Sequence, residues 1–271
     1  MKRILIIPGA GSSKLNWLDQ FIEFEEQGLK TFFLDYFAEY HRDFFSLINE
    51  SKYKLYEYFH LSIKKDDLQD IIVAHSMGAM KIVSILKDLT SSASKSKEDQ
   101  FLLENLKKSK IVLVQMPILT KNQVLSSLKS VSGMASLMIK AHEPFKDSVS
   151  DFLSDFKLKS RFLPNPIKNI FDMLWILSAM HISAYTTPEK AFTNMVDFYD
   201  SWNLLESNIY QALRDFNIHM TVSNSDFFVD KEEALKFAEI ISAKTKDFDW
   251  TFHNPMHFPW SQKEFNEWVI S

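Results

Sequence analysis

The chain has 271 residues, of which 46% are hydrophobic and 24% charged, with a formal net charge of −4 and no cysteine. This length and apolar content are enough for one large buried core, as a single domain or a domain with an insertion. The modest charge offers no field that would attract nucleic acid or an anionic membrane, and the lack of cysteine excludes disulfides, thiol nucleophiles and thiolate metal sites.

Short apolar runs that favour strands alternate along the chain with patterns that favour helices. The runs suit strands buried on both faces of a parallel sheet, and they lie at residues 3–8, 30–35, 70–74, 110–115, 217–222 and 249–253. Helices are predicted at residues 15–27, 42–60, 77–89, 231–243 and 262–269. This alternation predicts an α/β fold with a doubly wound, mostly parallel sheet of about six strands. Residues 90–100, rich in Ser and Lys, are expected to form a surface loop.

The first predicted strand follows the basic start Lys2-Arg3, a combination that briefly resembles a signal peptide. The apolar run is too short for a signal peptide and ends in Pro8-Gly9. The longest apolar stretch, residues 170–180, falls short of the roughly 20 residues that cross a bilayer. We therefore expect a soluble, cytoplasmic protein.

Two of the five glycines of the chain, Gly9 and Gly11, follow the first predicted strand. One interpretation is a glycine loop that binds phosphate, with Asp35 after the next strand as a ribose-binding acid. However, the third glycine of the dinucleotide fingerprint is missing, and no G-K-[ST] sequence occurs. A dinucleotide site would also leave the motifs described below unexplained, so no cofactor is expected.

The segment Ala74-His75-Ser76-Met77-Gly78 joins the third predicted strand to a helix. It resembles the nucleophile elbow, usually written G-x-S-x-G, of the α/β-hydrolase superfamily, with Ala74 in place of the first glycine. The serine of such an elbow lies on a tight turn, and its neighbours two before and two after must be small because strand and helix crowd them. The resemblance implies Ser76 as the nucleophile. Adjacent residues on a sharp turn point in different directions, so His75 is expected to pack or to hydrogen-bond nearby and not to act as the base. The alternative is that Ser76 only caps the helix.

The same resemblance implies an oxyanion hole made by two backbone N–H groups, those of Ala10 and Met77. Ala10 lies in the loop after the first strand, and Met77 directly follows the nucleophile. Many family members have histidine where this chain has Pro8, but the donors are backbone groups and survive that change.

About 100 residues separate the fourth and fifth predicted strands, far more than one crossover needs. They contain several helical patterns, which predict a helical cap at residues 116–216 inserted into a hydrolase core of residues 1–115 and 217–271. Apolar side chains of the cap either pack on each other or line a pocket for a hydrophobic substrate. The candidate substrate-binding residues are Gly9, Gly11, Met116, Met138, Trp175 and Phe258.

Two aspartates follow the fifth predicted strand, where the family has the acid of its triad. Asp226 follows a polar turn and precedes apolar residues, which is the family pattern, and Asp230 stands where a helix N-cap is expected. The resemblance implies Asp226 as the acid, with Asp230 as the alternative.

The last predicted strand is followed by His253 and His257, and the family carries its catalytic histidine in this loop. His257-Phe258-Pro259 before an amphipathic helix resembles the family pattern, so His257 is the expected general base and His253 the alternative. The two histidines are four residues apart, but Pro255 lies between them and no HExxH motif occurs. No metal site is therefore expected.

Taken together, the resemblance implies a serine hydrolase, similar to esterases and lipases with a helical cap, that cleaves a carboxylic ester with a hydrophobic group. Thioester hydrolysis, acyl transfer and lactone hydrolysis use the same triad and remain alternatives. A hydrolase-like fold that only binds a ligand is the non-enzymatic alternative. The expected partner is a hydrophobic small molecule, and the oligomeric state stays open.

Overall fold

The computed structural model describes residues 2–9, 14–34, 44–61, 70–92, 94–118, 210–223, 229–248 and 259–271. The strands are β1 (Arg3–Ile7), β2 (Lys30–Phe33), β3 (Asp70–His75), β4 (Lys110–Val114), β5 (Asn217–Val222) and β6 (Lys244–Asp247). The α-helices are α1 (Leu18–Glu26), α2 (Phe44–His60), α3 (Met77–Ser91), α4 (Lys97–Lys108), α10 (Lys231–Ile240) and α11 (Pro259–Ile270). Two 3₁₀ helices are η1 (Lys14–Trp17) and η4 (Gln211–Asp215).

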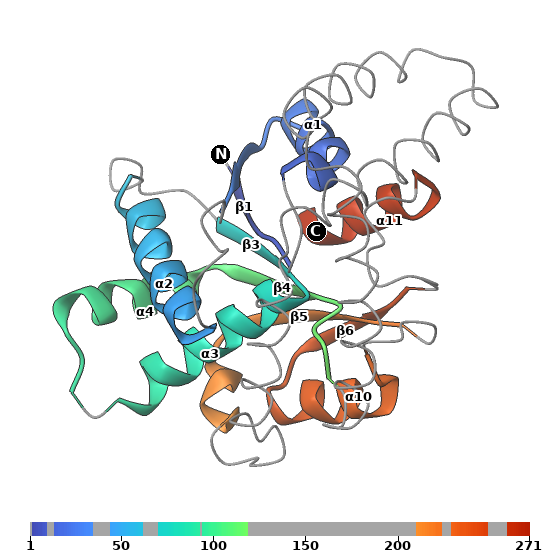
Figure 1. Cartoon of the computed structure of the whole chain (residues 1–271). Helices are drawn as coiled ribbons and strands as arrows, with labels where there is room; N and C mark the ends of the chain where they lie inside the picture. The colour runs from blue at the N-terminus through green and yellow to red at the C-terminus, as the bar shows by residue number, and fades with distance from the viewer. Residues whose placement is uncertain are drawn as a thin grey trace, which may run out of the picture.

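The six strands form one parallel sheet in the order β2-β1-β3-β4-β5-β6 (Figure 1). This confirms the predicted doubly wound parallel sheet of six strands. The chain runs outward from β1 to β2, then returns to place β3 on the other side of β1. Ligands of open α/β sheets bind where the strand order reverses in this way, beyond the carboxyl ends of the strands. Here that point lies between β1 and β3.

Helices cover both faces of the sheet, because successive side chains of a buried strand point to opposite faces. Leu5 and Ile7 of β1 belong to the core on the side of α2, α3 and α10, whereas Ile4 and Ile6 belong to the core on the side of α1 and α11. Figure 1 shows α1 and α11 together on one side of the sheet, and α2, α3, α4 and α10 on the other. Continuous apolar strands are the pattern that such a two-sided core requires.

The structure differs from the predicted elements at two places. The sixth strand is Lys244–Asp247, ahead of the predicted segment 249–253, which lies outside the described residues. The side chains of this strand, KTKD, are mostly exposed and none is apolar, which is common for a strand at the edge of a sheet. The predicted loop 90–100 is wrong, since α3 continues to Ser91 and α4 begins at Lys97.

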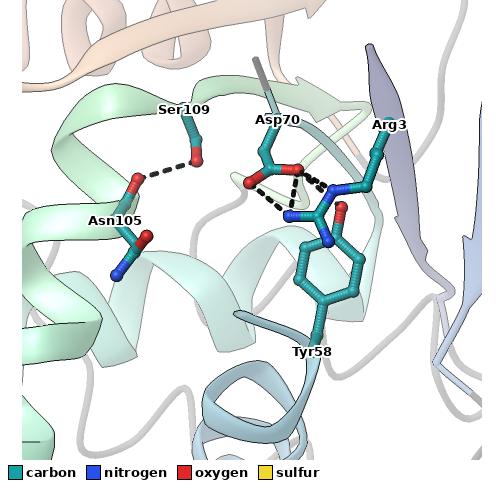
Figure 2. Close-up of polar contacts among 5 residues, drawn as sticks. All are labelled: Arg3, Tyr58, Asp70, Asn105 and Ser109. Carbon is teal, nitrogen blue, oxygen red and sulfur yellow. Dashed lines mark hydrogen bonds and ion pairs between the residues drawn. The ribbon is translucent and has the colours of Figure 1, made fainter. Parts of the chain in front are cut away.

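An ion pair joins the first residues of β1 and β3 at the edge of the sheet where the strands begin (Figure 2). The Arg3 Nε and Nη2 atoms each donate to an Asp70 carboxylate oxygen at 2.7 Å. The Tyr58 hydroxyl of α2 donates to the same carboxylate at 2.9 Å, and the Arg3 guanidinium lies 4.6 Å from the Tyr58 ring centre. Burial and the Asp70 charge both raise the pKa of the Tyr58 hydroxyl. These contacts fix the register of β1 against β3.

Lysine side chains at the same edge bind the end of the C-terminal helix. Lys2 donates to the carbonyl of Ile270 at 2.8 Å and Lys110 to that of Trp268 at 2.9 Å. Cations stabilise the carboxyl end of a helix, where backbone carbonyls have no partner in their own helix. Burial, with the charges of Lys2 and Lys244, lowers the pKa of Lys110 to about 8.

Both ends of the predicted cap continue into the core of the sheet. Met116 and Ile118 after β4 are buried, and Ile118 pairs with Val229 in an isolated parallel bridge. Tyr210 and Leu213, just before β5, are fully buried against the same core. The predicted cap between residues 119 and 209 lies outside the described residues. Within the described part, no helix is long and apolar enough to cross a membrane.

Candidate active site

Ser76 occupies a strained backbone conformation at the junction of β3 and α3. Its φ is 51° and its ψ is −121°. A residue with a Cβ rarely adopts positive φ, and such outliers persist only when the surrounding structure holds them. The Ser76 N–H donates to the carbonyl of Val114, the last residue of β4, at 2.9 Å. Its carbonyl accepts from the N–H groups of Ala79 and Met80 in the first turn of α3. The turn is thus held by the adjacent strand and by its own helix.

The side chain of Ser76 makes no capping hydrogen bond to α3. A serine that serves as an N-cap lies in extended backbone and accepts from an N–H two or three residues on. Ser96 at the start of α4 does this, with φ −62° and a side chain that accepts from the Asp99 N–H. The comparison rules out the interpretation of Ser76 as a simple helix cap.

The chain packs so tightly around Ser76 that only small residues fit at two neighbouring positions. A Cβ added at Gly78 would lie 2.4 Å from the carbonyl oxygen of Ile7 and 2.6 Å from that of Pro8. A Cβ added at Gly9 would lie 2.8 Å from the Cβ of Ser76. The end of β1 therefore lies directly against the turn, as the small residues at these positions predict.

The His75 side chain packs against Trp17 and Gly9. It is buried, and its ring meets the ring of Trp17 edge-on, with centres 5.8 Å apart. A Cβ at Gly9 would lie 2.9 Å from its Nδ1 atom. Of the two expectations for His75, packing or hydrogen bonding nearby, the contact with Trp17 shows the packing. No pattern in the sequence indicated that Trp17 would contact His75.

The Met77 N–H begins α3, where a helix leaves its first N–H groups without intrahelical partners. The positive end of the helix dipole lies at the same point. A negative charge that develops beside Ser76 would be stabilised there. Ala10, the other predicted donor, lies outside the described residues, and Gly9 directly before it lies against Ser76.

A second strained residue follows β4 beside the turn at Ser76. Gln115 has φ 44°, is buried, and its N–H donates to the Thr221 hydroxyl of β5 at 2.9 Å. Met116, a predicted substrate-binding residue, comes next, and its side chain is fully buried in the core. Sequence patterns gave no sign of this conformation, since glutamine does not favour positive φ.

The predicted acid and base belong to segments that leave the same edge of the sheet as Ser76. The segment with Asp226 begins after Ser223 at the end of β5, and that with His257 begins after Phe248 at the end of β6. The predicted site residues Ala10, Gly11, Met138, Trp175, Asp226, His257 and Phe258, with the alternative base His253, lie outside the described residues.

The alternative acid, Asp230, caps a helix. Its carboxylate accepts from the Glu233 N–H at 3.1 Å, which places it as the N-cap of α10. This is the capping position that the sequence indicates. Across the described ranges, no three His, Asp or Glu side chains gather as a possible metal site.

No protein-family model and no curated protein sequence matches the chain. Its structure matches many solved structures. A carboxylesterase from the thaumarchaeon Nitrososphaera gargenis superposes with a TM-score of 0.59 at 11% identity, covering 99% of this chain and 88% of that one. A thermostable carboxyl esterase from Bacillus coagulans gives 0.58 at 13% identity, with 99% and 88% covered. A monoacylglycerol lipase from Paleococcus ferrophilus gives 0.57 at 9% identity, with 99% and 93% covered.

The chain has the α/β-hydrolase fold. At such low identity, the likeness concerns the course of the backbone and not the chemistry. Ser76 lies between a strand and a helix of this fold, with the strained angles described above.

Proposed function

We propose that the protein is a serine hydrolase that cleaves a carboxylic ester with a hydrophobic acyl or alcohol group. The backbone of Ser76 carries the proposal, because a strained, buried turn is retained where its geometry serves a function. The α/β-hydrolase fold adds support, since proteins named as carboxylesterases and a lipase share it.

The proposed reaction proceeds through an acyl-enzyme. His257 takes the proton of Ser76 while the Ser76 oxygen attacks the ester carbonyl, and the N–H groups of Ala10 and Met77 bind the resulting oxyanion. His257 then gives the proton to the departing alcohol. A water molecule, activated by the same imidazole, releases the carboxylic acid and restores the serine, while Asp226 orients the imidazole. The common edge from which these segments leave the sheet supports their meeting.

The substrate class is inferred from the predicted cap. Cap side chains such as Met138 and Trp175 are apolar, and pockets that bind small molecules are lined mostly by apolar groups. An ester with an acyl chain or another hydrophobic group would suit such a lining.

A fluorophosphonate probe tests the nucleophile, with p-nitrophenyl esters as substrates. We expect stoichiometric labelling of the wild-type protein, mapped by mass spectrometry to Ser76, and loss of labelling and turnover in Ser76→Ala. The control is Ser84→Ala on the same helix, whose hydroxyl donates to the Met80 carbonyl and which should label normally. A folded wild-type protein that is not labelled, or is labelled elsewhere, would contradict the proposal. Far faster turnover of matched thioesters would reassign the substrate class.

A further inference from the structure

The side chain of His75 lies against Gly9, which follows β1, and against Trp17, the last residue of η1. The Cα of Gly9 approaches so closely that a Cβ would lie 2.9 Å from the His75 Nδ1 atom and 3.2 Å from the His75 carbonyl oxygen. Glycine alone permits this approach. Gly9 is therefore in contact with the imidazole and with Ser76 at once.

Trp17, the last residue of η1, contacts the same imidazole. Trp17 is fully buried within the core between the sheet and α1, next to Phe21 and Phe24. Its ring meets that of His75 at an interplanar angle of 68°. The rigid core thus fixes Trp17, and Trp17 in turn fixes the imidazole.

We propose that His75 is a positioning residue for the oxyanion hole, held by Trp17 and bracing Gly9 against Ser76. The inference rests on the proposed function, in which the Ala10 N–H binds the oxyanion. The imidazole touches neither substrate nor the reacting atoms. Its effect passes through the backbone of Gly9, which precedes the donor.

This role has a kinetic signature that packing alone would not give. An oxyanion hole binds the transition state more strongly than the ground state, so a displaced donor lowers kcat and leaves KM nearly unchanged. Displacements of about 1 Å cost about 10²-fold in rate, and loss of one donor costs about 10²–10³-fold. We therefore expect a loss of about 10- to 100-fold in kcat when the brace is removed.

The test compares His75→Ala with wild type on a p-nitrophenyl ester, below the melting temperature of both. A trifluoromethyl ketone, which forms a tetrahedral adduct with serine, reports on the oxyanion hole directly. In His75→Ala, we expect its inhibition constant to rise by about the factor by which kcat/KM falls. The acidic limb of the pH profile should keep its position, because His75 is not the base. Trp17→Phe keeps an aromatic edge and should lose less in the same parameters.

The chain offers a matched control in a second His–Trp contact, between His219 and Trp268 at the opposite edge of the sheet. The ring centres are again 5.8 Å apart, at an interplanar angle of 64°. His219→Ala should change the melting temperature and leave kcat, KM and the inhibition constant at their wild-type values. This separates loss of a buried ring contact from loss of the brace.

Unchanged kcat and inhibitor affinity in folded His75→Ala, or a loss confined to KM, would overturn the inference. If His75→Ala does not fold, unchanged kcat and inhibitor affinity in Trp17→Phe would overturn it in the same way. A wild-type protein that the fluorophosphonate does not label would overturn the proposed function and this inference together. If the wild-type protein is labelled normally but His75→Ala and Trp17→Phe keep the wild-type kcat and inhibitor affinity, only the inference about His75 is overturned.

Discussion

Ser76 carries a Cβ in a backbone conformation with positive φ, which glycine adopts more easily. The strain of a non-glycine residue in such a region costs about 1–3 kcal/mol, and the surrounding hydrogen bonds hold it. The chain keeps a serine there and places glycine at position 78, where the carbonyls of Ile7 and Pro8 leave no room for a Cβ. Ser76 is therefore constrained by its backbone angles, and Gly78 by the lack of space for a Cβ.

A matched pair of variants measures the strain at Ser76. Ser76→Ala keeps the Cβ and the strain, whereas Ser76→Gly removes both at an entropic cost of about 0.5–1 kcal/mol. We expect the glycine variant to exceed the alanine variant by about 1 kcal/mol in the free energy of unfolding, measured with urea, and both to be inactive. A glycine variant that is less stable than the alanine variant would show that the turn is unstrained.

Replacing each of the two aspartates after β5 by asparagine distinguishes which of them is the acid of the proposed triad. Asp226→Asn is expected to lower kcat about 10⁴-fold with little change in the melting temperature, because in the proposed mechanism the His257 imidazole loses the group that orients it. Asp230→Asn should leave both quantities nearly unchanged, because asparagine caps helices as well as aspartate does. Steady-state kinetics and thermal unfolding check both variants. The reverse pattern would make Asp230 the acid.

At the scale of elements, the pair Arg3–Asp70 sets how β1 and β3 align. In parallel strands, a shift by one residue exchanges the two faces of the sheet, so a polar contact at the strand ends adds specificity to apolar strands. The same register places Ile7 beside Ala74 and so brings Gly9 against Ser76 at the far end. A contact at the start of the strands therefore supports the geometry of the site.

Removal of one partner from this buried pair leaves a charge without compensation. Asp70→Asn should lower the free energy of unfolding by about 3–5 kcal/mol. The control is Asp215→Asn, which breaks the exposed pair with Lys107 and should cost less than about 1 kcal/mol. Chemical unfolding of both variants provides the comparison. Equal losses would show that the Arg3–Asp70 pair behaves like a surface contact.

The core strands and the nucleophile turn could be predicted because each leaves a strong local signal. Buried parallel strands are continuous apolar runs, and the turn concentrates small residues in a chain that has five glycines. The edge strand β6 carries no such signal, because it pairs with β5 alone and its side chains are mostly exposed. Helix α4 did have one in Ser96 and Asp99, which form a capping box, but the lysines and serines around them are typical of loops.

The positions of Trp17 and Gln115 could not be read from their neighbours in the sequence. Trp17 meets His75 only because β1 and β3 lie side by side, and Gln115 takes positive φ because β4 and β5 hold it on both sides. Contacts between segments that are distant in the sequence determine the position of Trp17 and the conformation of Gln115. Such residues become visible only when the sheet is assembled.

For the molecule as a whole, the half-buried edge where the strands begin makes stability depend on pH. Burial, with the charges of Lys110 and Lys244, lowers the pKa of His219 to about 4. The unfolded chain, whose histidine titrates near 6.5, therefore binds a proton that the folded protein does not. Stability is lost as the pH falls from about 6.5 to 4. Lys110, with its pKa of about 8, adds stability as the pH rises from about 8 toward 10.5.

His219→Gln checks this contribution, since glutamine does not titrate. We expect the melting temperature of the variant to fall less than that of wild type between pH 6.5 and pH 4. Differential scanning calorimetry at closely spaced pH values gives the comparison. Equal slopes in the two proteins would mean that His219 does not take part in the acid response.

The hydrogen bond from the Ser76 amide to Val114 joins the two central strands, so we expect this backbone proton to exchange with solvent only when the sheet opens. Deuterium should therefore enter this amide as slowly as it enters the middle of β3. Heat inactivation, on this basis, would follow the global melting curve and would have no earlier step at Ser76.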